Sequence, residues 1–160
     1  MRGAFTRISK ASFRLLHFSV QADHVHLLVE ADGHIPLQRG IQGLAIRVAK
    51  AINRMLGRRG KVWAGRYHAR ALPTPREVRH ALVYVLQNFR KHLKRIRGLD
   101  PRSSALWFTG WRTSIVRPSG RPPVSAPMTW LAAVGWRRHG LVGVDEAPRP
   151  PIPRSRGGPR

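Results

Sequence analysis

With 160 residues, the chain is long enough for one compact domain and a tail, and hardly for two. Its 30 Lys and Arg against 7 Asp and Glu give a formal net charge of +23, which is unlike an ordinary metabolic enzyme and favours a polyanionic partner. No apolar run is long enough for a membrane span, and the N-terminus lacks a signal-peptide core. The sequence has no cysteine for disulfides or thiolate metal sites. We therefore expect a cytoplasmic nucleic-acid-binding protein, with a ribosomal-type RNA binder as the alternative.

Two strands joined by a short turn are expected first, over residues 12–20 and 24–30. Apolar residues then recur at helical spacing from Leu37 to Met55, and basic residues follow the same period. Residues 61–72 predict a third strand. Glu77 is the only acidic residue from position 34 to position 99, so we expect the middle of the chain to form a basic surface.

A second helix has a clear predicted start, with Thr74 as N-cap, Pro75 in the first turn and Glu77 completing a capping box. It is expected to run to about residue 97 and to end at Gly98. The order strand, strand, helix, strand, helix predicts an α+β fold in which helices pack against an antiparallel sheet. We expect residues 1–98 to form this domain, 99–146 an extension with a linker and a short helix, and 147–160 a disordered basic tail.

His24 and His26 are the first candidates for chemistry. Alternate side chains of a strand share a face, so both imidazoles are expected to project the same way and their rings to converge. Two such imidazoles can bind one divalent ion if a third ligand completes the site. A His-x-His motif alone is more often a pair of histidines on a solvent-facing side of a sheet than a metal site.

Tyr84 is the second candidate, because of its position on the second helix. The apolar face of that helix is formed by Val78, Leu82, Leu86, Phe89 and Leu93. The opposite face is expected to carry His80, Tyr84, Gln87, Asn88 and Lys91. Tyr84 is therefore expected outside the core, with its hydroxyl available to a group beyond this helix.

These motifs, FSVQADHVHLLVE followed by RYHARALPTPREVRHALVYVLQNFRKH, resemble the HUH single-tyrosine transposases, and within them the REP-associated tyrosine transposases. The resembling stretch runs from about Phe13 to Leu93, and DPRSSALWFTGW and TWLAAVGWRRHG look like the extension of one bacterial branch of that group. The resemblance implies an RRM/ferredoxin-like HUH fold that cleaves and rejoins DNA during transposition, through a 5′-phosphotyrosine intermediate.

The resemblance also assigns roles to particular residues. It implies that His24 and His26 bind a divalent metal, Mg²⁺ or Mn²⁺, and that Tyr84 is the nucleophile. Asn88 matches the position of a third metal ligand, with Gln87 as the fallback. Asp23 is a departure, since the family usually has Asn before the first histidine.

Single-stranded or hairpin DNA is the expected partner, with no membrane partner, for a monomer or a homodimer. Residues expected to hold the DNA backbone are Arg47, Lys50, Arg54, Arg66, Lys91 and Arg95. Only about a dozen residues precede the segment that matches the family, so we expect the family's first strand and helix to be missing. This leaves a catalytically decayed, DNA-binding remnant as the alternative function.

Overall fold

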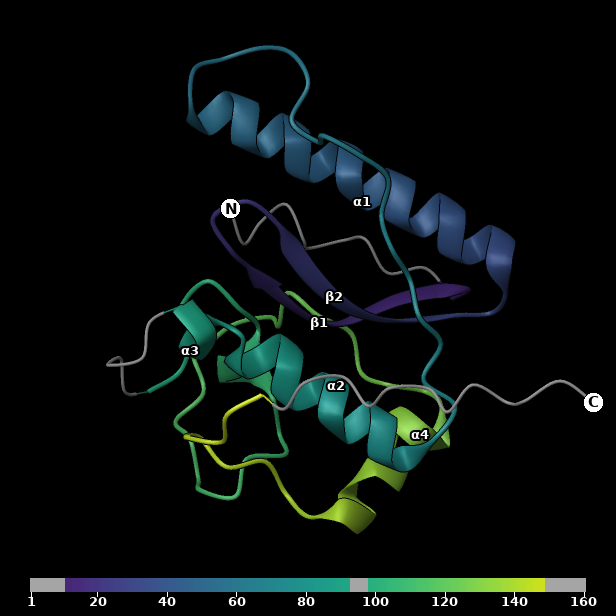
Figure 1. Cartoon of the computed structure of the whole chain (residues 1–160), viewed down its shortest axis with the longest axis vertical. Coiled ribbons are helices and arrows are strands. Elements are labelled where there is room, and N and C mark those ends of the chain that lie inside the picture. Colours follow the sequence, from purple (N-terminus) through teal and green to yellow (C-terminus); the bar gives the residue numbers. More distant parts are fainter. Residues whose placement is uncertain (1–10, 93–97, 149–160) are drawn as a thin grey trace, which may run out of the picture.

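The structure is a computed structural model that describes residues 11–92 and 98–148 (Figure 1). Its two strands are β1 (Phe13–Val20) and β2 (Val25–Ala31), and its longer helices are α1 (His34–Met55) and α2 (Pro75–Gln87). Shorter helical turns are α3 (Phe89–His92), η2 (Ala105–Trp107), α4 (Trp130–Ala133) and η3 (Gly135–His139). These elements form the predicted α+β fold. No helix within the two described stretches combines the length and the apolar character needed to cross a bilayer.

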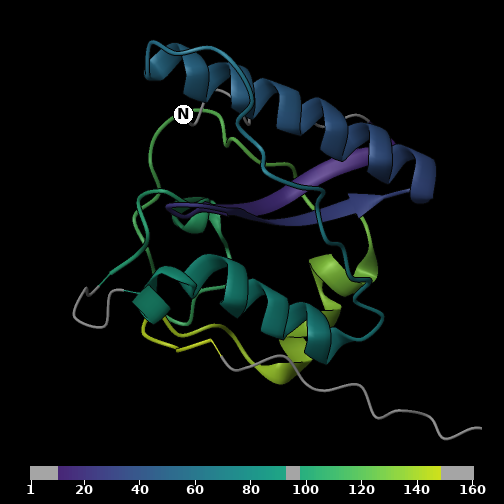
Figure 2. The same cartoon turned by 45° about the horizontal axis from the view of Figure 1, so that its top comes forward.

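A β-hairpin separates two helical layers (Figures 1 and 2). β1 and β2 pair antiparallel, with Ser19 opposite His26 and an irregularity in the register between Leu15 and His17. One face of the hairpin packs on α1 through the cluster Phe13, Leu15, Phe18, Leu44 and Val48. The other face packs on α2 through Leu16, Leu28, Val78, Leu82 and Leu86. The side chains that alternate along β2 therefore meet different helices.

The prediction of a third strand over residues 61–72 is wrong, because this segment forms no strand and is mostly exposed. It crosses from the end of α1 to the start of α2, and the Trp63 indole anchors it by donating to the Ala45 carbonyl at 2.9 Å. A strand needs a backbone partner. The outer edge of β1 is instead bonded to residues 102–104 and to Ser125.

The capping box at the start of α2 is confirmed, because the Thr74 hydroxyl accepts from the Glu77 amide at 3.2 Å. The helix is shorter than predicted: it ends at Gln87, α3 follows, and residues 93–97 lie outside the described part of the chain. The prediction that Gln87 and Asn88 stand on a solvent-facing side is also wrong, since they are 0% and 2% exposed.

The C-terminal extension explains this burial. Phe108, Trp111, Trp136 and Val142 join the core cluster of α2, so this helix is covered by the hairpin and also by residues 99–146. Helical periodicity indicates the side of α2 that meets the sheet, and it cannot reveal that a later segment packs on much of the remainder. The predicted tail falls mostly outside the described part of the chain, which ends at residue 148.

Polar contacts fasten the extension to the domain at two ends. The carboxylate of Glu30, at the end of β2, accepts from the Thr129 hydroxyl at 2.6 Å and from the Met128 and Thr129 amides at 2.9 Å each. Arg79 of α2 pairs with Glu146 through two contacts of 2.7 and 2.9 Å. The extension is therefore clamped to both β2 and α2.

Candidate active site

The two histidines meet at one point, as the sequence predicted for their rings. The Nε2 atoms of His24 and His26 are 2.9 Å apart, and the ring centroids are 4.5 Å apart. His24 directly precedes β2, while His26 lies within it and pairs with Ser19 of β1. The Nδ1 atom of His24 lies 2.6 Å from the Asp23 carboxylate, so Asp23 orients this imidazole.

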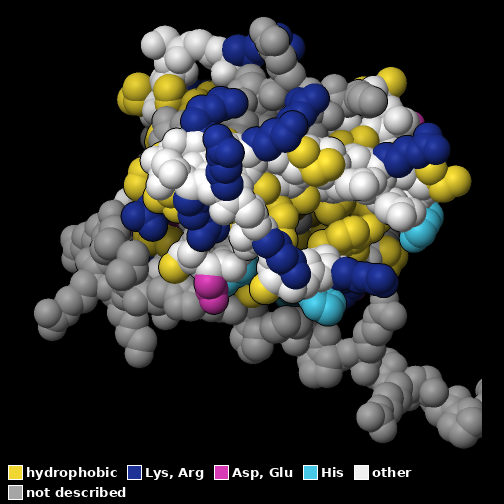
Figure 3. Space-filling model, turned by 90° about the horizontal axis from the view of Figure 1, so that it is seen from above, with side chains coloured by type: hydrophobic (Ala, Val, Ile, Leu, Met, Phe, Trp, Pro, Cys, Tyr) yellow, Lys and Arg dark blue, Asp and Glu magenta, His cyan; other side chains and the backbone are white. Residues whose placement is uncertain are grey.

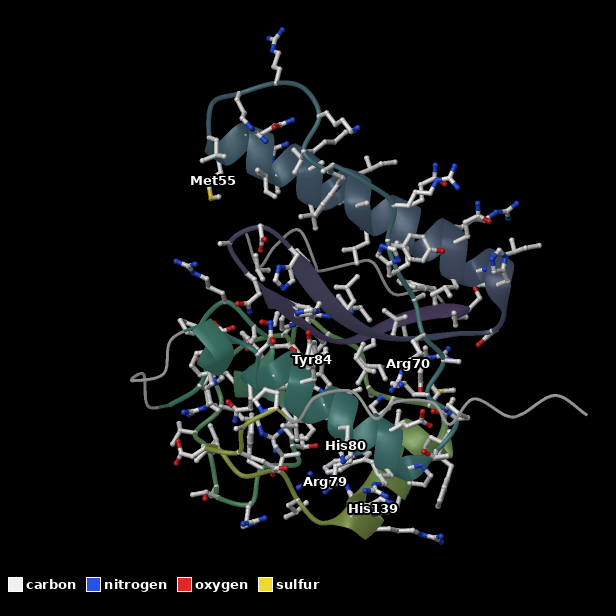
Figure 4. The ribbon with its side chains drawn as sticks, in the orientation of Figure 1. Met55, Arg70, Arg79, His80, Tyr84 and His139 are labelled. Carbon is white, nitrogen blue, oxygen red and sulfur yellow. The ribbon has the colours of Figure 1, made fainter. Side chains whose placement is uncertain are left out.

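The helical period predicts Tyr84 on the face of α2 opposite its apolar residues, but it lies on the side that faces the hairpin (Figure 4), because the extension covers much of the rest of the helix. Its ring packs edge-on against His26, with centroids 4.8 Å apart and planes at 74°. The side chain is half-buried, unlike its neighbours Val83 and Val85, which belong to the core. The fold thus brings the two histidines and the tyrosine into one continuous cluster.

Gln87 and Asn88 are both buried but have different surroundings. The Gln87 amide donates to the carbonyls of Gly143 at 3.2 Å and Val144 at 2.7 Å, and its oxygen accepts from Arg90 at 3.0 Å. By contrast, the Asn88 Oδ1 atom is buried without a hydrogen-bond partner among the described residues. An unpaired buried carbonyl oxygen is costly, and it is typical of a site that awaits a proton donor or a cation.

This donor set fits a divalent metal. Two nitrogens bound at right angles to one octahedral ion, each at about 2.1 Å, lie about 3.0 Å apart, which matches the separation of the two Nε2 atoms. The Asn88 side chain carries an oxygen of the kind that hard cations prefer, whereas the Gln87 amide already donates to the Val144 carbonyl of the extension. Within the described residues no group of three or more His, Asp or Glu side chains could hold a metal.

His17 and Ser19 share the α2-facing side of the hairpin but have structural partners. The His17 Nδ1 atom lies 3.0 Å from the Ser104 hydroxyl, and the ring packs on Phe108. Burial lowers the pKa of His17 to about 4, so the ring is neutral at pH 7. The Ser19 hydroxyl donates to Asp100 at 3.1 Å.

Comparison with known protein families decides the family. The model described as "Transposase IS200 like" matches residues 4–88, which is more than half of the 160-residue chain. The chain belongs to the IS200-like transposase family. No curated protein and no solved structure matches it.

The family match covers the site of this IS200-like transposase and ends at Asn88. The match therefore contains His24, His26 and Tyr84, and the extension that buries α2 lies beyond it. An IS200-like transposase acts on DNA, and the composition agrees with this, since the chain carries +23 formal charges.

The predicted DNA-binding residues of this transposase lie in different places. Arg47, Lys50, Arg54 and Arg66 are exposed on α1 and the segment after it, where Figure 3 shows a face rich in Lys and Arg. The hairpin lies between α1 and α2, the helix that carries Tyr84 (Figures 1 and 2). The Lys91 side chain and all of Arg95 lie outside the described part of the chain.

Proposed function

We propose that this transposase cleaves and rejoins single-stranded or hairpin DNA with Tyr84 as nucleophile, as a cytoplasmic enzyme of the REP-associated tyrosine type. The observation that carries this proposal is the contact between the Tyr84 ring and the ring of His26, which in turn meets His24. Asn88, one helical turn after Tyr84, adds support, because its buried side-chain oxygen has no hydrogen-bond partner among the described residues.

The proposed step is a transesterification. The Tyr84 oxygen attacks the scissile phosphorus, a bond forms between them, and the bond from phosphorus to the 3′-oxygen of the preceding nucleotide breaks. The tyrosine proton ends on that 3′-oxygen, which leaves a 5′-phosphotyrosine and a free 3′-hydroxyl. One phosphodiester replaces another, so rejoining to a different 3′-hydroxyl needs no nucleotide cofactor.

His24, His26 and Asn88 are proposed to hold a divalent cation, Mg²⁺ or Mn²⁺. Such an ion, when bound, polarises the scissile phosphate and offsets the charge that develops on its oxygens. Asp23 supports the site by accepting a hydrogen bond from His24 Nδ1, which leaves Nε2 of that ring as the ligand atom. The contact with His26 positions the Tyr84 ring beside this cluster.

The distribution of charge supports a DNA partner that extends beyond the site. Residues 34–72 contain no acidic side chain, and the exposed side chains of Arg47, Lys50 and Arg54 lie on α1, which covers the face of the hairpin away from α2. These residues are proposed to neutralise phosphates of a DNA hairpin stem or of a distant part of the strand, because the β-hairpin lies between α1 and α2, the helix that carries Tyr84.

The test is adduct formation on labelled hairpin-bearing single-stranded DNA with Mn²⁺ or Mg²⁺. The wild-type chain should form a covalent adduct that survives denaturation, and Tyr84→Phe should form none while still binding DNA. Tyr67→Phe is the matched control, because Tyr67 is the chain's other tyrosine and is 46% exposed in the segment after α1. It should behave as the wild type does.

Two outcomes would overturn the proposal. An adduct that persists in Tyr84→Phe would assign the nucleophile to another residue. A wild-type chain that binds the DNA tightly and never forms an adduct with either metal would be a DNA-binding remnant of a transposase. The two-stranded sheet within the described residues is the observation that favours this second reading.

A further inference from the structure

A pocket of about 800 Å³ lies on α2, at the junction with the C-terminal extension. The N-terminal half of α2 forms one wall with Arg76, Arg79 and His80, while Arg112, His139 and residues 143–147 form the other. Figure 4 shows Arg79, His80 and His139 gathered in this region, whereas Tyr84 lies closer to the hairpin. The pocket belongs mostly to the extension and is distinct from the histidine cluster.

The pocket carries an excess of positive charge. Its two carboxylates are already paired: Glu146 with Arg79 at 2.7 Å, and Asp145 with Arg90 at 2.9 Å. Among the described residues, Arg76 and Arg112 take part in neither of these ion pairs, although the charge of Arg112 also acts on Glu146 and helps to lower its pKa. Two guanidinium groups on opposite walls of one hollow favour an anion between them, and phosphate is the anion that guanidinium groups bind with matching geometry.

Arg76, which lines the pocket, precedes the proposed nucleophile by eight residues along α2. Arg76, His80 and Tyr84 are four residues apart, so they follow one another along α2 with a rotation of about 40° at each step. At about 1.5 Å per residue, Arg76 is about 12 Å from Tyr84 along the helix axis, the length of three to four stacked nucleotides at about 3.4 Å each.

We infer that this pocket binds backbone phosphates of the DNA strand about three to four nucleotides from the phosphate that Tyr84 attacks. Arg76 and Arg112 contact the phosphate oxygens, and the Arg79–Glu146 pair keeps the wall in place. The inference rests on the proposed function, since it extends the path of the same strand. It gives the C-terminal extension a part in substrate binding beyond covering α2.

The test measures binding of fluorescent dT20 without metal, so that it does not depend on cleavage. Removing one cation that neutralises a phosphate should lower the slope of log affinity against log salt by about 0.7, so Arg76→Gln with Arg112→Gln should lower it by about 1.4. The ratio of wild-type affinity to the affinity of this double variant should then fall about sevenfold between about 50 and 200 mM salt. Arg117→Gln with Arg121→Gln, the same charge change in the exposed linker, should leave the slope nearly unchanged.

A length series locates the bound phosphates. Shortening dT20 stepwise to dT4 should cost the wild-type chain more affinity than it costs the double variant, because only the wild type uses phosphates at the pocket. Arg76→Gln alone is the second variant, since Arg76 is exposed in the first turn of α2 and its replacement should not disturb folding. It should lower the salt slope by about 0.7.

Three results would overturn the inference. The salt slope of the pocket variants could equal that of the linker control, or the wild type and the double variant could lose affinity equally as dT20 is shortened. In the third result, Arg112→Gln would abolish binding of inorganic phosphate and leave binding of dT20 unchanged. The last would identify a site for free phosphate. If the pocket variants bind dT20 more weakly as expected but the wild type never forms an adduct, the pocket stands and the proposed cleavage fails. An adduct in the wild type with no effect of the pocket variants refutes the pocket alone.

Discussion

The imidazole of His26 lies edge-on against the phenol ring of Tyr84, with ring centroids 4.8 Å apart. One residue comes from the hairpin and the other from α2, on the face where these two elements share a core. Because both belong to the same chain, the fold unites the proposed metal ligands and the proposed nucleophile without a second subunit.

Mixing two inactive variants tests this assembly within one chain. Tyr84→Phe lacks the nucleophile, and His24→Ala with His26→Ala lacks the metal ligands. If each site is formed by a single chain, the mixture should yield no more adduct than the two variants do separately. The wild-type yield per chain should also be independent of protein concentration. Adduct recovered by mixing would show that Tyr84 serves the histidines of a partner.

Asn88 and Gln87 should respond differently to truncation. Asn88→Ala removes a buried oxygen that has no partner among the described residues, so the free energy of unfolding should change by about 1 kcal/mol or less, whereas Mn²⁺ affinity should fall at least about tenfold. Gln87→Ala removes the hydrogen bonds of a fully buried amide to Gly143, Val144 and Arg90, although Val144 and Arg90 keep their own contact at 2.9 Å, and should destabilise the fold by about 1–3 kcal/mol.

Calorimetric titration with Mn²⁺ and urea unfolding check this pair. Mn²⁺ affinity of the Gln87→Ala chain should stay close to that of the wild type at temperatures where the chain is folded. A larger drop in Mn²⁺ affinity in Gln87→Ala than in Asn88→Ala would reverse the assignment of the third ligand.

Glu30→Gln should loosen the extension. The carboxylate is 7% exposed and accepts from the Thr129 hydroxyl, two backbone amides and Arg14. Burial opposes ionisation, but these hydrogen bonds outweigh it and lower the pKa of Glu30 below its usual range. Its replacement should cost about 2 kcal/mol in urea unfolding. Asp32→Asn, at the more exposed partner of Arg14, is the control and should cost less than about 0.5 kcal/mol.

His17 should make the fold sensitive to mild acid. Burial lowers its pKa from 6.5 to about 4, so the unfolded chain binds a proton between these values and the folded chain does not. Stability should therefore be full above pH 6.5 and should fall by at most about 1.4 kcal/mol per unit as the pH drops from 6.5 toward 4. Glu30 and Glu146, whose pKa values are lowered, add losses only below about pH 4.5.

Urea unfolding from pH 7 to pH 4.5 measures this dependence. His17→Gln should flatten the curve in that window, since the amide does not titrate and can still contact Ser104. His34→Gln, at an exposed histidine, should leave the curve unchanged. An equally steep curve in His17→Gln would show that another group carries the dependence.

Local patterns predict much of the fold. Strand alternation places His24 and His26 on one face, and the capping box fixes the start of α2 at Pro75, because both depend on neighbouring residues. The prediction of a third strand fails for a reason outside its own sequence: residues 61–72 have the composition of a strand, but they pair with no strand in the part of the chain that the structure describes.

The surroundings of α2 also cannot be predicted from local sequence patterns. A helical period shows which side chains share a face, and it does not show what will cover that face. The period predicts Gln87 beside Tyr84 on a polar surface, yet the Gln87 amide is buried against the carbonyls of Gly143 and Val144. The pocket beside Arg112 is unpredictable for the same reason, since its two walls are distant in sequence.

The most direct test of the central claim is to locate the covalent bond by mass spectrometry. The transposase is incubated with hairpin-bearing single-stranded DNA and Mn²⁺, digested with nuclease and protease, and its peptides are sequenced. We predict a 5′-phosphorylated nucleotide remnant on Tyr84, in the peptide His80–Arg90 that trypsin would release, and none on Tyr67. A remnant on any other residue, or unmodified Tyr84 after verified DNA cleavage, would contradict the account.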